Sequence, residues 1–154
     1  MTTQQLAAMD LDKDLAAAKE ASYTLFAAQR TLDDARDDFK DTAEDYMYNT
    51  GKYQYVTAQH QWQAAQYTYN AAVQSFETSF RTLYLQVKDY QQVLQASKTA
   101  LATEQDNFAA AQKKHDLGNL SDNALADAKD KVSEAQDKVD GAAIDLFSAY
   151  NNYR

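Results

Sequence analysis

The sequence predicts an all-α protein, an elongated antiparallel coiled-coil bundle of three helices in which one long helix is flanked by two shorter helices stacked end to end. Apolar residues recur every seven positions, and such a repeat keeps one narrow seam of each helix against its neighbour. The 154 residues include no proline and only three glycines, so little interrupts a helix. The repeat comprises Leu11, Ala18, Leu25, Leu32, Phe39 and Tyr46; Tyr55, Trp62, Tyr69, Phe76, Leu83 and Tyr90; Phe80, Val87, Leu94, Leu101 and Phe108; and Leu125, Val132, Val139, Leu146 and Tyr153.

The first helix is expected over about residues 10–48. It precedes residues 49–52, where Asn49 and Gly51 can adopt the left-handed backbone conformation that ends a helix. The long second helix is then expected over about residues 53–116.

The third helix is expected over about residues 122–153, after a turn at residues 117–121. Gly118 suits the end of the preceding helix, and the hydroxyl of Ser121 suits the cap of the following one. Gly141 falls within the third helix and is expected to weaken it slightly without ending it.

The apolar seam changes position along the second helix, which predicts two different partners. The first helix is expected to lie along its first half and the third helix along its second half, within a single domain over residues 1–154. Small residues beside the large ones let such helices approach closely. These residues are Ala21, Ala28 and Ala35 in the first helix, Ala58, Ala65 and Ala72 in the second, and Ala128, Ala135, Ala142 and Ala149 in the third.

Composition and charge argue against several functions. The net charge of −8 argues against nucleic acid as a partner, because phosphate binding needs clustered Lys and Arg. No apolar run is long enough for a membrane span or for a signal-peptide core, so neither is expected in this chain.

No enzymatic chemistry is predicted, and neither a metal site nor a cofactor site. Neither His60 nor His115 has a glutamate at the Glu-x-x-His spacing of di-iron helical bundles. Glycine-rich phosphate loops, nucleophile motifs and cysteines are all missing from the sequence. His115 is expected to pack in the seam or to cap the end of its helix.

Aromatic residues gather around the first turn. Tyrosine favours interfaces where its apolar ring is buried and its hydroxyl reaches water. Tyr48, Tyr53 and Tyr67 lie off the seven-residue repeat and are therefore candidates for contact with a partner or with membrane headgroups. Their neighbours on the repeat are expected to pack in the core instead; these are Tyr46, Tyr55, Trp62 and Tyr69.

The order and spacing of these features resemble the helical part of the TolC-like outer membrane efflux proteins. Residues 80–87 are similar to the start of a long helical segment in that family. A glycine, a small hydroxyl residue and then an alanine and aliphatic ladder follow in the family, and the matching residues here are Gly118, Ser121, Leu125, Ala128, Val132 and Ala135. The strands that build the family's membrane barrel are replaced by the turn at residues 49–52. The resemblance therefore covers one helical repeat only, and this chain is not expected to span a membrane.

The resemblance implies a non-catalytic transport component of the cell envelope, outside the cytoplasm, which forms a homo-oligomer. It also implies that the second turn docks to a helical-hairpin adaptor protein through Leu117, Gly118, Asn119, Leu120 and Ser121. The alternative for Leu117 and Leu120 is that they cover the end of the seam. A second hypothesis for the whole chain is a stand-alone, cytosolic coiled-coil module that binds one protein through its acidic face or its tip.

Overall fold

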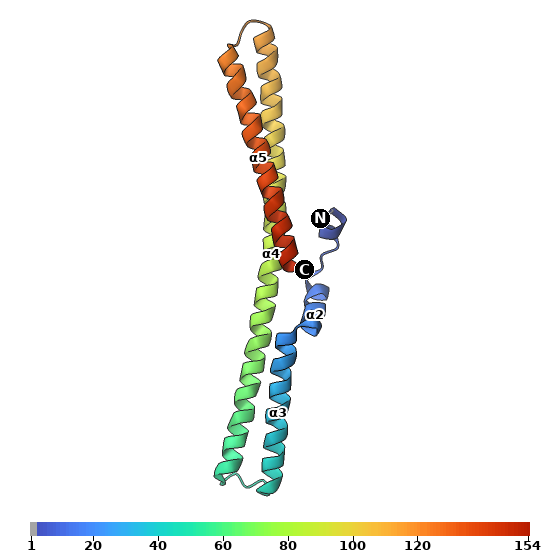
Figure 1. Cartoon of the computed structure of the whole chain (residues 1–154), viewed down its shortest axis with the longest axis vertical. Helices are drawn as coiled ribbons and strands as arrows, with labels where there is room; N and C mark the ends of the chain where they lie inside the picture. The colour runs from blue at the N-terminus through green and yellow to red at the C-terminus, as the bar shows by residue number, and fades with distance from the viewer. Residues whose placement is uncertain (1–2) are drawn as a thin grey trace. The chain divides into compact units, whose positions relative to one another are not determined.

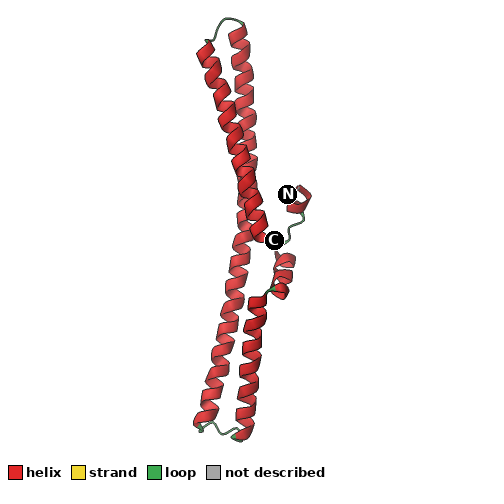
Figure 2. Ribbon diagram, viewed as in Figure 1, coloured by secondary structure: helices red, strands yellow, loops and turns green. Residues whose placement is uncertain are grey.

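The computed structural model describes residues 3–154, and within this range the chain forms helices and no strands (Figure 2). The prediction of an all-α protein with one long central helix is confirmed. The helices number five among the described residues, where the sequence predicted three. They are α1 at Thr3–Ala7, α2 at Leu11–Ala21, α3 at Tyr23–Asp45, α4 at Tyr53–Asp116 and α5 at Asp122–Tyr153.

Contacts divide the chain into two compact units, and the division falls within α4. The first unit, residues 3–81 of the described chain, holds α1, α2, α3 and the beginning of α4. The second unit, residues 82–154, holds the remainder of α4 and the whole of α5. In each unit α4 and its partner helix run antiparallel and are joined by a short turn (Figure 1). We call residues 46–52 the first turn and residues 117–121 the second turn.

The predicted helix over residues 10–48 is wrong in two places, and the first is at Ser22. Ser22 has an extended backbone conformation, with φ −75° and ψ 109°, and it separates α2 from α3. Its hydroxyl accepts a hydrogen bond from the N–H of Leu25 at 3.3 Å, which caps α3. A serine side chain offers the backbone this alternative to a continuous helix. Ala21, which a continuous helix would place beside the seam, is exposed.

The second error concerns the end of α3. The helix ends at Asp45, and the residues in the left-handed conformation are Met47 with φ 50° and Tyr48 with φ 56°, instead of Asn49 and Gly51. The Asn49 side chain accepts a hydrogen bond from the N–H of Gly51 at 3.0 Å and so shapes the turn without ending the helix.

The predicted bounds of the other two helices, 53–116 and 122–153, are confirmed. Gly118 has a φ of 73°, and the hydroxyl of Ser121 accepts from the N–H of Ala124 at 3.3 Å. Gly141 lies within α5 without interrupting it, as expected.

Each residue of the seven-residue repeat is buried or half-buried. Val87 is fully buried and Leu146 is 1% exposed, so both lie at the core of the second unit. In the first unit the ring of Phe39 stacks on Trp62, with centroids 5.3 Å apart, and meets the edge of Tyr55 at the same separation. The periodicity therefore identified much of the core of both units. Further buried residues lie outside the predicted repeat and its alanines, and these are Met9, Leu15, Ala43 and Tyr150.

Candidate functional site

The second turn is held by two backbone hydrogen bonds. The N–H of Gly118 donates to the carbonyl of His115 at 2.8 Å, and the N–H of Asn119 donates to the carbonyl of Lys114 at 2.9 Å. This pair of bonds is the Schellman arrangement, in which the residue just past the helix takes a left-handed conformation. Glycine adopts that conformation at no steric cost, so the turn presents its side chains on an unstrained backbone.

A histidine and an aspartate join the two helices across this turn. The Nε2 atom of His115, at the end of α4, lies 2.7 Å from Oδ1 of Asp122, the first residue of α5. This hydrogen bond raises the pKa of His115, and the charges of Asp122 and Asp116 act in the same direction. His115 therefore closes the end of the hairpin, which is nearer to the expected capping role than to packing in the seam.

The two leucines of the second turn differ in exposure. Leu117 is 76% exposed, whereas Leu120 is half-buried. Leu120 thus suits the interpretation that it covers the end of the seam, and Leu117 is available to a partner. Asn119 and Ser121 are also exposed.

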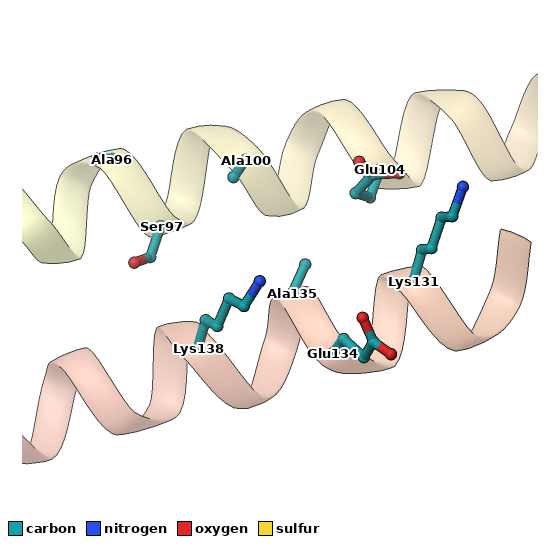
Figure 3. A pocket seen from close by; sticks show the side chains of 8 residues that line it. All are labelled: Ala96, Ser97, Ala100, Glu104, Lys131, Glu134, Ala135 and Lys138. Carbon is teal, nitrogen blue, oxygen red and sulfur yellow. The ribbon is translucent and has the colours of Figure 1, made fainter.

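A groove of about 360 Å³ lies between α4 and α5 in the second unit. Ala100 of α4 and Ala135 of α5 point toward one another there, while Lys131 and Lys138 extend from α5 toward α4 (Figure 3). The small side chains leave the space open, because large residues at these places would fill it. The complete lining comprises Ala96, Ser97, Ala100, Glu104, Lys131, Glu134, Ala135 and Lys138.

Several exposed aromatic and apolar side chains lie in the first turn and at the start of α4. Met47 is 88% exposed, Tyr48 61% and Tyr53 79%. Tyr67, on α4, is 77% exposed. Tyr48, Tyr53 and Tyr67 are therefore accessible, and their role as contacts stays a prediction.

Among residues 3–154, no group of three or more His, Cys, Asp or Glu side chains is placed to hold a metal ion. Sequence reasoning missed three features of the candidate site: Met47, the His115–Asp122 pair and the groove. His115 and Asp122 are seven residues apart and meet only because the turn brings them together. No local sequence motif predicts that contact. The groove had a partial signal, because the repeat places Ser97 and Glu104 where an apolar residue is usual.

Comparisons with protein-family models, with curated proteins and with solved structures return no match. In the described part of the chain, no helix is both long and apolar enough to cross a membrane.

Proposed function

We propose that this chain is a non-catalytic helical scaffold that resembles one helical repeat of a TolC-like efflux duct. It acts by self-association along the second unit and by docking of the second turn to a helical-hairpin adaptor protein. The observation that carries the proposal is the groove between α4 and α5, which three alanines line.

The groove suits another helix for steric reasons. Its floor consists of small residues, including Ala96, Ala100 and Ala135. Small side chains allow a neighbouring helix to approach closely and to insert its larger residues between them. A scaffold of thin hairpins gains buried apolar area by packing its hairpins together in this way.

The charges around the groove suit a second copy of the same chain. Lys131 and Lys138 line it together with Glu104 and Glu134, so both signs are present. In a two-fold contact each surface meets itself in the opposite orientation, which allows the lysines of one copy to pair with the glutamates of the other. A groove of a single sign would repel its own copy.

Sedimentation velocity over a range of micromolar concentrations tests this proposal. We expect wild-type protein to associate as its concentration rises. The variant Ala100→Gln fills the groove with a helix-compatible side chain and is expected to weaken association about tenfold or more. Ala109→Gln is the matched control, because Ala109 is exposed on α4 and does not line the groove. Monomeric wild-type protein at every concentration would contradict self-association.

The docking of the second turn is supported by the exposure of Leu117 on a rigid turn. The same feature supports the alternative, a stand-alone module that binds a single protein partner. A monomer that binds a helical-hairpin protein through Leu117, and loses that binding in Leu117→Ser, would favour the module. A signal peptide encoded upstream of Met1 would favour the envelope component and a place outside the cytoplasm.

The proposal includes coiled-coil packing of the helices, with the two outer helices end to end beside α4 in a single domain. The continuity of α4 through both units supports this arrangement. Small-angle X-ray scattering tests it, since a rigid rod and a pair of hinged hairpins give different distance distributions.

A further inference from the structure

The first turn places two bulky residues in a backbone conformation that they rarely adopt. Met47 has φ 50° and Tyr48 has φ 56°, and both values lie in the left-handed region. Residues with a Cβ atom are strained there, and such strain persists only where the surrounding structure holds it. Strained residues of this kind often mark functional positions.

Backbone hydrogen bonds hold the strained pair. The N–H of Tyr48 donates to the carbonyl of Ala43 at 2.7 Å, and the N–H of Met47 donates to the carbonyl of Glu44 at 3.0 Å. Ala43 is buried, so the turn is anchored to the core of the first unit. The consequence is a fixed backbone whose Met47 and Tyr48 side chains are exposed to solvent.

The exposed side chains in and beside the first turn are uncharged and largely apolar. Met47 is apolar and polarisable, while Tyr48 and Tyr53 each combine an apolar ring with a polar hydroxyl. Residues 46–51 carry no charge, and the run is preceded by Asp45 and followed by Lys52. An uncharged tip with tyrosines suits the boundary between lipid chains and headgroups, where tyrosine is enriched.

The charges next to the tip restrict the type of lipid. Asp41, Glu44 and Asp45 are exposed in the last turns of α3. With the exposed Lys40 and Lys52, they leave the surroundings of the tip net negative. These carboxylates repel an anionic bilayer surface, whereas a zwitterionic surface has no net charge to oppose them.

We propose that the first turn, together with Tyr53 at the start of α4, is a peripheral membrane contact that inserts Met47, Tyr48 and Tyr53 into the headgroup region of a zwitterionic bilayer. The turn lies at the end of the α3–α4 hairpin (Figure 1), which lets these side chains enter the interface while the helices remain in water. This contact does not depend on the groove of the second unit or on self-association.

Flotation with large unilamellar vesicles of phosphatidylcholine tests the proposal on the full chain at physiological salt. We expect the wild-type protein to float with the vesicles. Met47→Gly and Tyr53→Gln are each expected to lower the partition coefficient about tenfold, the scale of removing one apolar side chain from the interface. Met47→Gly is the more informative variant, because it relieves backbone strain and should raise the thermal midpoint while binding falls.

Tyr67→Gln is the matched control, since Tyr67 is as exposed as Tyr53 but lies along α4, away from the turn. Its partition is expected to equal that of the wild type. Three results would overturn the proposal: wild-type protein that stays with the unbound fraction, an equal loss of binding in Tyr67→Gln, or binding that requires phosphatidylglycerol and disappears in high salt. Unchanged helical circular dichroism in each variant makes these results comparable.

Discussion

The two turns of this protein share one hydrogen-bonding arrangement and differ in the residue that occupies its key position. Each turn ends a helix with the same pair of backbone bonds, from Met47 and Tyr48 in the first and from Gly118 and Asn119 in the second. Gly118 is the left-handed residue of the second turn, whereas Met47 takes its place in the first turn and is followed by a second left-handed residue, Tyr48. The second turn is therefore conformationally relaxed, and the first is held in place by its contacts.

The partner helices of α4 in the two hairpins also differ in how many side chains they bury. In the second unit, α5 buries seven side chains, among them alanines that let α4 approach closely. In the first unit, α3 buries only Leu25 and Ala43, and its packing relies on half-buried aromatic rings such as those of Phe39 and Trp62. Small side chains at a seam allow a close approach, whereas rings keep the helices apart and leave their own edges accessible.

Exposed large apolar side chains occur in both units, but the two with the highest exposure in the described chain, Met47 at 88% and Tyr23 at 81%, lie in the unit that has the strained turn. The second unit combines a relaxed turn with a seam whose buried residues on α5 all lie within residues 135–153, and the first combines a strained turn with a seam that α3 buries at two residues. A strained, exposed turn is retained where something other than stability favours it.

The largest effect that tests the comparison is expected from a seam residue of the second unit. Leu146→Ala removes a side chain that is 1% exposed and should lower the free energy of unfolding by about 3 kcal/mol. Phe39→Ala, in the half-open seam of the first unit, should cost less, about 2 kcal/mol. Urea unfolding measures both values, and hydrogen exchange locates each loss in its own unit. Equal costs would mean that the two seams are equally closed.

A reciprocal exchange at the turns is expected to have the next largest effect. Met47→Gly should stabilise the protein by about 1 kcal/mol, and Gly118→Met should destabilise it by about 1 to 2 kcal/mol, because only glycine takes this conformation freely. A Cβ atom at Gly118 meets nothing within 4 Å, so the cost there is conformational and not steric. Thermal unfolding of both variants checks the signs. If Met47→Gly destabilises the protein instead, the backbone of the first turn is not strained.

A glycine inside a helix should respond with the opposite sign. Gly141 lies within α5, and a Cβ atom there also meets nothing within 4 Å. Gly141→Ala should therefore stabilise the protein by about 0.5 to 1 kcal/mol, since alanine favours the helix and restricts the unfolded chain. Gly118→Ala is the comparison, and it should destabilise. If both alanine variants shift the urea midpoint in the same direction, the interpretation that Gly118 is required for its left-handed backbone conformation is wrong.

The smallest effect is expected from pH. The hydrogen bond to Asp122 raises the pKa of His115 in the folded protein above the ordinary value of 6.5. Protonated His115 then stabilises the second turn fully below its unfolded-state pKa, and this contribution is lost as pH rises through the folded-state pKa. Stability of wild type relative to His115→Gln should therefore fall with pH in that window, and the NMR titration of His115 should have a midpoint above 6.5. A midpoint below 6.5 would contradict the pairing.

Residue patterns predicted the second unit better than the first, and the two turns explain why. Gly118 and Ser121 are residues whose own conformational and hydrogen-bonding preferences end one helix and begin the next, so the bounds of α4 and α5 could be predicted. Met47 has no such preference, and Ser22 is compatible with a helix interior as well as with a cap. The end of α3 and the break before it could therefore not be located from local preferences alone.

By itself, the sequence determined the helical class, the side chains that face the seam and the position of the second turn. Periodicity and the preferences of glycine and serine are local properties, which depend little on the remainder of the chain. Only the tertiary structure decided that Met47 takes the left-handed position, that His115 meets Asp122 and that a groove remains beside Ala135. Each of these depends on how closely two helices approach, and that distance results from packing across the whole seam.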